Sequence, residues 1–540
     1  TLSGVTLLGL PAEVYLYGMQ YSMMTVSLIF VGIASNYIYL PVFYKLQLTT
    51  AFDYIELRFD KRVKRIASVF YTVASLLFLP VIIYAPSLAF NQVTGFDLHI
   101  IAPIMSLICV FYTAIGGLKA VVWTDTLQFS VTLCTLAFVL VLGTKSVGGL
   151  AAVLERSKLG DRLEFFNMNP DPTVRNTFWA VVLGNIALWI AFIGIDPAGV
   201  QRFLAVPSLM DARKCLVIFI VFTIITKFIS CFSGLIMYTK YFDCDPLTAG
   251  FMKKADQILP YYVLEVAAAV PGLSGLFVAG LFSTALSTLS TCLNALSGIV
   301  YKDFVAPFMP RDTSDEKAST LMKIITVVLG LISVLLIFVV ERLGTILELM
   351  LSLRGITTGP ILGIFTMGML FPVANRKGAL CGAIGSVLLM SLIIVQNQIY
   401  VWNGIIRNTP KPLDTSGCNI TTSTQSVLFN YTTTTLPSTN TIPPSCPSEE
   451  PFWLYRISFH YYFLLGALVT MIIGLPISLI TRSKEDLFVN PDLLSPFVNR
   501  FLRRSAETTR CESVEKELQF IGINKNRAGS KDAAMDKLLH

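Results

Sequence analysis

The chain has 540 residues, of which 54% are hydrophobic and only 14% are charged, and its mean hydropathy is +0.67. A water-soluble domain needs about 25% charged residues to cover its surface, so this composition excludes an ordinary soluble protein and predicts a protein that faces lipid. The net charge of +7 does not indicate nucleic-acid binding, because the basic side chains lie in loops between apolar runs, where they orient a membrane protein.

Eleven apolar runs are long enough to cross a bilayer, and helices are expected because isolated strands cannot satisfy their backbone in lipid. Residues 1–18 are too short and too rich in glycine and proline for a twelfth span, and we expect them to be the outer half of a helix whose inner half is missing. The fold class is therefore an all-α integral membrane protein. The predicted spans are 21–43, 66–87, 98–117, 126–146, 178–199, 215–238, 274–300, 321–340, 346–372, 378–400 and 457–481.

The distribution of lysine and arginine predicts the orientation of these spans. If residues 482–540 form a cytoplasmic tail, the inner loops are about threefold richer in Lys and Arg than the outer loops. The tail itself is polar and is expected to be mostly disordered. Six inner basic residues cluster within 45–65, namely Lys45, Arg58, Lys61, Arg62, Lys64 and Arg65.

The polar loop 401–455 supports the same orientation. It contains two glycosylation sequons, which begin at Asn419 and Asn430. Glycans are added on the lumenal side, so we expect this loop to be extracellular and glycosylated at both positions. Cys418 and Cys446 flank the sequons and are predicted to form a disulfide in that oxidising compartment, with Cys244 as the competing partner.

The sequence contains no pattern of residues that indicates catalysis. The ten cysteines show no CxxC pair and no Cys/His metal spacing, and the chain has no nucleophile–base pair and no phosphate-binding glycine loop. We therefore do not expect an enzyme, and we expect no resident cofactor.

One span carries a row of hydroxyl side chains. Thr284, Ser287, Thr288 and Thr291 fall at positions i, i+3, i+4 and i+7, which places them on one face of a helix. Sodium is a hard cation that prefers oxygen ligands, and neutral hydroxyls provide them without burying a charge. Ser and Thr in membrane helices also permit close packing or bond to their own backbone, so the spacing alone leaves both interpretations open.

Three of the charged residues within the predicted spans bear on substrate binding. Lys227 is midway along its span, Arg354 is about nine residues into its own, and Glu348 is nearer the outside. A charge at such a position costs at least ~2.5 kcal/mol, so it faces a cavity or a partner. Two interpretations stay open: Glu348 forms a structural pair with one of the cations, or Lys227 or Arg354 is the counter-charge of a carboxylate substrate.

A sequence motif then identifies a family. Residues 112–125 read Tyr-Thr-Ala-Ile-Gly-Gly-Leu-Lys-Ala-Val-Val-Trp-Thr-Asp, which resembles the signature of the sodium/solute symporter family. Residues 40–44, 84–87, 91–97 and 243–246 resemble its branch of sodium-coupled monocarboxylate, multivitamin and iodide transporters. The resemblance extends from residue 1 to about residue 480.

The resemblance implies a fold and a domain arrangement. The family has thirteen helices, ten of them in an inverted five-helix repeat of the leucine-transporter type. Residues 1–372 are then the transport core with a truncated first helix, residues 373–481 add two helices around the loop 401–455, and residues 482–540 are the tail. The implied protein is a multi-pass plasma-membrane glycoprotein whose partners are sodium, a small organic anion and the lipid bilayer.

The resemblance also assigns site residues. It implies a sodium site made by the Ser287 and Thr288 hydroxyls and by the carbonyls of Thr284 and Leu2. Thr6 matches the monocarboxylate branch, whereas the iodide branch has an amide at this position. The implied substrate-binding residues are Thr6, Leu10, Met24, Trp189, Leu347 and Leu351; Lys227 and Arg354 are further candidates only because of their charge within a span.

Two departures from the family pattern concern ion binding. The chain has Asp196-Pro197 where the branch has Asn-Gln, and Phe78 replaces a tyrosine near a second sodium site. Both departures leave open how many sodium ions are transported with each substrate. The function implied is sodium-driven symport of a small organic anion, either a monocarboxylate such as lactate or pyruvate or a vitamin carboxylate such as biotin or pantothenate. A non-transporting or channel-like member of the family, because of the missing helix half, and transport of an inorganic anion such as iodide are the alternatives.

Overall fold

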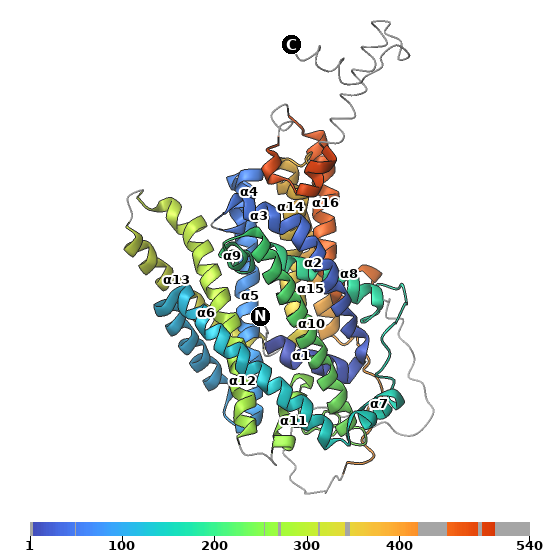
Figure 1. Ribbon diagram of the computed structural model, residues 1–540. Helices are drawn as coiled ribbons and strands as arrows, with labels where there is room; N and C mark the ends of the chain where they lie inside the picture. Colours follow the sequence, from blue (N-terminus) through green and yellow to red (C-terminus); the bar gives the residue numbers. More distant parts are fainter. Residues whose placement is uncertain are drawn as a thin grey trace, which may run out of the picture.

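The computed structural model of the chain describes residues 4–48, 50–252, 254–267, 272–310, 314–340, 346–418, 451–483 and 489–502. Within these ranges every regular element is helical and there is no strand, which confirms the predicted all-α class. Figure 1 shows one elongated bundle, with α3 and α4 near one end and α7 and α11 near the other.

The elements follow one another along the chain in this order. The first half of the chain contains α1 (Gly4–Tyr17), η1 (Met19–Met23), α2 (Met24–Ala34), η2 (Ser35–Tyr39), α3 (Leu40–Leu46), α4 (Ala51–Arg58), α5 (Lys61–Thr94), α6 (Leu98–Ser146), α7 (Leu150–Leu159), α8 (Phe178–Ile190), η3 (Ala191–Ile195), α9 (Pro197–Leu204) and α10 (Leu209–Lys240). The second half contains η4 (Ala255–Gln257), α11 (Ile258–Ala267), α12 (Leu273–Val300), η5 (Tyr301–Val305), η6 (Ala306–Phe308), α13 (Asp315–Val340), α14 (Ile346–Leu370), α15 (Arg376–Trp402), η7 (Trp453–Arg456), η8 (Phe459–Tyr461), α16 (Tyr462–Ile480) and η10 (Pro491–Leu493).

Eleven helical stretches of the described chain are long and apolar enough to cross a membrane, and each corresponds to one of the predicted spans. Several consist of more than one element; for example, Met19–Leu46 joins η1, α2, η2 and α3. The predicted spans 98–117 and 126–146 lie in one helix, α6, of 49 residues. A straight helix of this length would measure about 73 Å, so both spans cross one bilayer of about 30 Å only if the chain turns between them.

The first helix, α1, is short and central. Its 14 residues extend over about 21 Å, too little for a complete span. Figure 1 places α1 between the two ends of the bundle. Leu8, Leu10 and Val14 are at most 1% exposed, so other helices surround α1. Pro11 lies inside it and has no backbone N–H, which leaves the Leu7 carbonyl without its helical donor.

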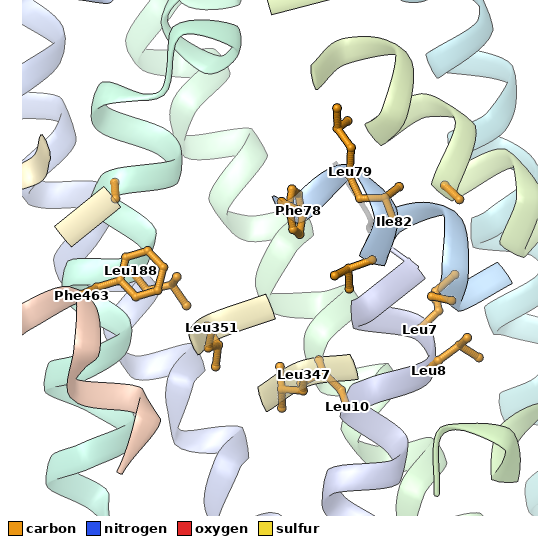
Figure 2. Close-up of a cluster of buried hydrophobic side chains, with 14 of the residues drawn as sticks. Leu7, Leu8, Leu10, Phe78, Leu79, Ile82, Leu188, Leu347, Leu351 and Phe463 are labelled. Carbon is orange, nitrogen blue, oxygen red and sulfur yellow. The ribbon is translucent and has the colours of Figure 1, made fainter. Parts of the chain in front are cut away.

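One hydrophobic core joins α1 to the rest of the bundle. Figure 2 shows part of it, with side chains from five helices: Leu7, Leu8 and Leu10 of α1, Phe78, Leu79 and Ile82 of α5, Leu188 of α8, Leu347 and Leu351 of α14 and Phe463 of α16. Three residues with a predicted binding role, Leu10, Leu347 and Leu351, therefore belong to this core.

Glycines allow the last three helices to pack closely. A Cβ atom on Gly359 of α14 would lie 2.9 Å from the Phe463 carbonyl oxygen of α16. A Cβ atom on Gly382 of α15 would lie 2.5 Å from the Thr470 carbonyl oxygen of α16. Small residues at such positions let membrane helices approach through their backbones. The two C-terminal helices are thereby packed directly onto α14.

A disulfide connects two loops at the α11 end of the bundle. Cys418 bonds to Cys244, so the predicted pairing of Cys418 with Cys446 is wrong. The reason is backbone pairing between the loops: Gly417 N–H donates to the Asp243 carbonyl at 2.8 Å, and Asp245 N–H donates to the Asp414 carbonyl at 2.7 Å. Cys446 and the two predicted glycosylation sites, Asn419 and Asn430, lie outside the described residues.

The disulfide assignment predicts a difference between two cysteine variants. Cys244→Ser should leave Cys418 reactive, whereas Cys446→Ser should leave the Cys244–Cys418 bond intact. Loss of a native disulfide typically costs 2–5 kcal/mol, so only Cys244→Ser should lower the thermal midpoint by several degrees. Mass-tag labelling of free thiols before and after reduction measures the bond. A new thiol at Cys418 in the Cys446→Ser protein would contradict the assignment.

Candidate functional site

A cavity of about 460 Å³ lies in the bundle between α1, α5, α8, η3, α9, α10, α12 and α14. It extends to Arg202 and Phe203 of α9 and to Cys215 and Phe219 in the first turns of α10. The residues with a predicted binding role that line it are Thr6, Leu10, Trp189, Leu347, Lys227, Arg354 and Thr288. The structure thus brings together residues from five separate helices; their role in binding stays a prediction.

Four described residues of the predicted sites are not among those that line this cavity, namely Met24, Leu351, Thr284 and Ser287. Met24 and Leu351 are 0% and 1% exposed, and each is packed in the hydrophobic core. The positions of Met24 and Leu351 suit a role in supporting the residues that form the cavity wall. Leu2, the predicted backbone ligand of sodium, lies outside the described residues.

Lys227 of α10 is a buried cation on the cavity wall. Its Nζ donates a hydrogen bond to Thr6 Oγ1 of α1 at 2.7 Å and lies 5.1 Å from the centre of the Trp189 ring. In the described part of the chain, no carboxylate lies within ion-pair distance of this Nζ. A hydroxyl and an aromatic face stabilise an ammonium group only partially, so Lys227 retains an uncompensated positive charge.

Arg354 of α14 has a different environment. Its Nη2 lies 3.7 Å from Asp196 Oδ2, and its guanidinium group lies 4.6 Å from the Phe78 ring centre and 4.3 Å from that of Phe192. Arg354 Nε is buried and has no hydrogen-bond partner. The predicted pairing of an intramembrane cation with Glu348 is therefore wrong for Arg354, because Asp196 is the nearer carboxylate.

Asp196 also explains the local departure from the family pattern. Its Oδ1 accepts a hydrogen bond from Ala198 N–H at 2.9 Å, and Pro197 occupies the first turn of α9. An aspartate cap followed by proline is a favoured helix start. The pair Asp196-Pro197 thus begins α9 and places a carboxylate beside Arg354. The second departure, Phe78, provides an aromatic face for the same guanidinium group.

Arg202 is a cavity residue to which the sequence assigned no role. It lies on α9, and its Nη2 donates a hydrogen bond to Thr291 Oγ1 at 2.8 Å. Thr291 is the last member of the predicted hydroxyl face of α12. The spacing of the hydroxyls could not reveal this contact, because it depends on how α9 folds back against α12.

Two other hydroxyls of this face, those of Thr284 and Thr288, bond to their own helix. Thr284 Oγ1 donates to the Gly280 carbonyl at 2.8 Å and lies 2.8 Å from Thr132 Oγ1 of α6. Thr288 Oγ1 donates to the Thr284 carbonyl at 3.0 Å and lines the cavity. The interpretation in which these hydroxyls bond to their own backbone is therefore correct for Thr284 and Thr288. Each hydroxyl oxygen keeps lone pairs for a cation, so sodium binding here stays a prediction.

A buried ionic layer joins α1 and α14 to the loop before α8. Arg175 of that loop binds Glu13 of α1 twice, through Nε–Oε1 and Nη2–Oε2 contacts of 2.9 Å each, and binds Glu348 of α14 once, at 3.1 Å. Asn176 Nδ2 donates to Glu13 Oε1 at 2.8 Å, and the His460 ring lies 3.0 Å from Asn176 Oδ1. Glu348 is thus paired with Arg175, not with Lys227 or Arg354.

The charge of Arg175 is strongly favoured at this position. Burial by itself lowers the pKa of its guanidinium group, but the carboxylates of Glu13 and Glu348 outweigh burial and raise the pKa well above its ordinary value. The Tyr17 and Phe459 rings cover the guanidinium at 4.4 and 4.7 Å. Arg175 therefore joins three segments as a permanently charged group.

A second cavity lies beside this layer. Leu347 lines the larger cavity, while its neighbour Glu348 lines a second cavity of about 290 Å³ together with Arg175. The second cavity is bounded by the end of α15 and by residues 451–459. Arg175 and Glu348 of the layer thus face the second cavity, one residue along α14 from the wall of the larger one.

A bundle of membrane-spanning helices around a central cavity with charged walls is the architecture of a membrane transporter, and comparison with known proteins places the chain more closely. Residues 1–385 match the model of the family described as "Sodium:solute symporter family". The chain belongs to this family. It is therefore a sodium-coupled solute symporter, a multi-pass membrane protein and not an enzyme, with sodium as its coupling ion.

Named relatives cover almost the whole chain. It is 36% identical over 485 residues to sodium-coupled monocarboxylate transporter 1 of Xenopus laevis, which covers 89% of this chain and 77% of that protein. It is 36% identical over 531 residues to sodium-coupled monocarboxylate transporter 2 of Mus musculus, with 98% and 82% covered. It is 31% identical over 547 residues to the sodium-dependent multivitamin transporter of Oryctolagus cuniculus, with 99% and 84% covered.

Two solved structures share the fold. A Na⁺-coupled sialic acid symporter in a substrate-bound outward-open state aligns with a TM-score of 0.68 at 21% identity, covering 89% of this chain and 87% of that one. Mhp1, a nucleobase-cation-symport-1 family transporter, aligns with a TM-score of 0.50 at 12% identity, covering 91% and 92%. Both have the leucine-transporter-type fold, which confirms the predicted architecture.

The ionic layer predicts an order of stability among variants. Glu13→Gln removes the two-bond partner of the buried Arg175 and should cost about 3–5 kcal/mol, whereas Glu348→Gln removes a single, more exposed contact and should cost less. Thermal unfolding of the purified protein in detergent measures both. Lys214→Gln removes the exposed pair with Asp211 and serves as the control with little expected change. Equal destabilisation by all three changes would contradict the role of this layer.

Proposed function

We propose that the chain catalyses sodium-coupled symport of a small organic monocarboxylate, and that Lys227 is the counter-ion of the substrate's carboxylate. The observation that carries this proposal is the position of Lys227, a buried cation on the cavity wall with a hydroxyl and an indole ring beside it but no carboxylate among the described residues. The names of the relatives, monocarboxylate and multivitamin transporters, agree with a carboxylate substrate.

The surroundings of Lys227 suit such a ligand. An ammonium–carboxylate hydrogen bond is about twice as strong as a neutral one. Thr6 Oγ1 accepts a hydrogen bond from Lys227, so its own proton is available for a substrate oxygen. Leu10, Trp189 and Leu347 provide apolar surface for the carbon skeleton. An inorganic anion such as iodide would make no use of that surface.

Arg354 is the weaker candidate for the same role. Its charge is shared with Asp196, and two aromatic rings cover its guanidinium group. A cation that already has a carboxylate partner gains less from a second one. We therefore assign Arg354 to the structure of the wall and Lys227 to the substrate.

For the coupling ion, we propose the Ser287 and Thr288 hydroxyls and the carbonyls of Thr284 and Leu2. Thr288 lines the same cavity as Lys227, so an ion at this face and a carboxylate near Lys227 would bind in one space. Oxygen donors of this kind match the preference of a hard cation.

The ionic layer and the cavity suggest how access is controlled. The cavity reaches α9, at the end of the bundle that the basic residues predict to be cytoplasmic. We infer that the Glu13–Arg175–Glu348 layer, which begins one residue after Leu347 of the cavity wall, blocks access from the other side. In the proposed cycle this layer opens to admit substrate from outside. We place the protein in the plasma membrane, with residues 482–540 in the cytoplasm and glycans on Asn419 and Asn430 outside.

The counter-ion proposal predicts a charge-selective defect. Lys227→Met should raise the KM for a monocarboxylate at least tenfold, since losing about 1.4 kcal/mol of binding is a factor of ten. Uptake of the uncharged amide analogue should not weaken, because it never used the charge. Sodium-gradient-driven uptake into proteoliposomes measures both, with Lys214→Met as the matched control. An unchanged carboxylate KM at equal protein amounts would refute the proposal.

The sodium site predicts a separate defect. Replacing Ser287 and Thr288 by alanine removes two oxygen ligands and should raise the sodium concentration for half-maximal uptake at least tenfold. Ser297→Ala is the control, because Ser297 lies on the same helix and bonds to its own backbone at Asn294. Sodium titration of uptake gives the half-saturation value. If the double variant and the control titrate alike, the sodium ligands lie elsewhere.

A further inference from the structure

Residues 489–502, which follow the last span, are anchored on the end of the bundle that carries α3 and α4. The Tyr54 hydroxyl of α4 donates to the Leu493 carbonyl at 3.0 Å, and Ser495 N–H donates to the Met369 carbonyl of α14 at 3.0 Å. Leu494 and Ser495 are 3% and 0% exposed. Figure 1 shows this segment in orange-red beside the ends of α14 and α16. The segment is therefore a fixed part of this surface.

A cavity of about 250 Å³ separates this segment from α3, and basic groups lie on both sides of it. Lys45 comes from α3 and Arg500 from the C-terminal segment. Lys45 Nζ is paired with Asp492 at 2.5 Å, whereas Arg500 has no carboxylate within ion-pair distance in the described chain. The charged residues of the lining thus sum to one positive charge, and proline, valine and leucine side chains form much of the remaining wall.

The position of Lys45 fixes the depth of this cavity in the membrane. Lys45 is the penultimate residue of the span Met19–Leu46. Basic residues at the end of a span lie where the hydrocarbon meets the headgroups. The cavity between Lys45 and Arg500 is therefore at headgroup level.

The same segment exposes an aromatic face. Residues 496–502 are helical, and Phe497 and Phe501, four positions apart, are 69% and 70% exposed. Side chains at this spacing share one face of a helix. A short helix that combines exposed aromatic residues with Arg500 has the composition of a segment that lies in a membrane interface. The sequence continues with Arg503 and Arg504, which add positive charge.

We propose that this cavity binds the headgroup of an anionic phospholipid, with Lys45 and Arg500 at the phosphate and Phe497 and Phe501 inserted among the acyl chains. Charge complementarity and the headgroup depth select a lipid over a protein partner. Anionic lipids are concentrated in the cytoplasmic leaflet, which is the side that the basic residues predict for this end. The site is independent of the transport site, because it lies at the end of the bundle and shares no lining residue with the central cavity.

The test is lipid retention by the purified full-length protein. After exchange from mixed micelles of phosphatidylserine and phosphatidylcholine, mass spectrometry counts the lipids that stay bound. We expect preferential retention of phosphatidylserine, and about a tenfold loss of that preference when Lys45→Gln and Arg500→Gln are combined. Arg500→Gln alone should lose part of the preference while it keeps the Lys45–Asp492 pair.

Matched controls separate this site from general charge effects. Arg376→Gln with Lys377→Gln removes two exposed basic residues at the start of α15 and should leave retention unchanged. Phe497→Ser with Phe501→Ser should release the lipid, whereas Phe308→Ser, at a residue that is 89% exposed, should not. Equal retention of both lipids by the wild-type protein would overturn the proposal. So would equal losses in the two double-charge variants, or displacement of phosphatidylserine by millimolar inorganic phosphate.

Discussion

Charges inside this bundle must be compensated by other parts of the bundle, because lipid offers them neither water nor counter-ions. The structure meets this constraint in two places with partners from distant segments. Glu13, Arg175 and Glu348 join α1, the loop before α8 and α14. Asp196 and Arg354 join the start of α9 to α14. Asp196 and Arg354 line the central cavity, whereas Glu348 of the other group follows directly after the lining residue Leu347.

The need to compensate buried charges explains the importance of the dipeptide Asp196-Pro197. Asp196-Pro197 ends the π-helical turn η3 and starts α9 through a side-chain cap. The carboxylate that caps the helix is also the anion nearest to Arg354. One side chain therefore makes both a helix cap and an ion pair. The helix that it starts, α9, carries Arg202 to the hydroxyl face of α12.

The sequence predicted the parts of this structure that depend on local composition. All eleven spans follow from runs of apolar residues. The resemblance to the family indicated Thr6 and Trp189, and the position of a charge within a span indicated Lys227, before their contacts were known. The ionic partners were missed because they depend on long-range approach: Arg175 lies 162 positions from Glu13 and 173 from Glu348. Glu13 was not counted among the charges within spans, because α1 is too short to be a span. Glu13 is nevertheless buried, with 4% of its surface exposed. The Cys244–Cys418 pairing was not the predicted one for the same reason, because the two cysteines are 174 positions apart in the sequence.

The charges of the central cavity bear on coupling itself. Among the described residues that line it, Lys227, Arg202 and Arg354 are cations and Asp196 is the one anion. A sodium ion at the hydroxyl face would enter a space that is already positive, which opposes its binding. A carboxylate beside Lys227 reduces that repulsion, so each ligand in the proposed scheme improves the affinity for the other by the same factor. In this scheme the charge of Lys227 would, besides recognising the substrate, make sodium binding depend on the anion, which is what symport requires.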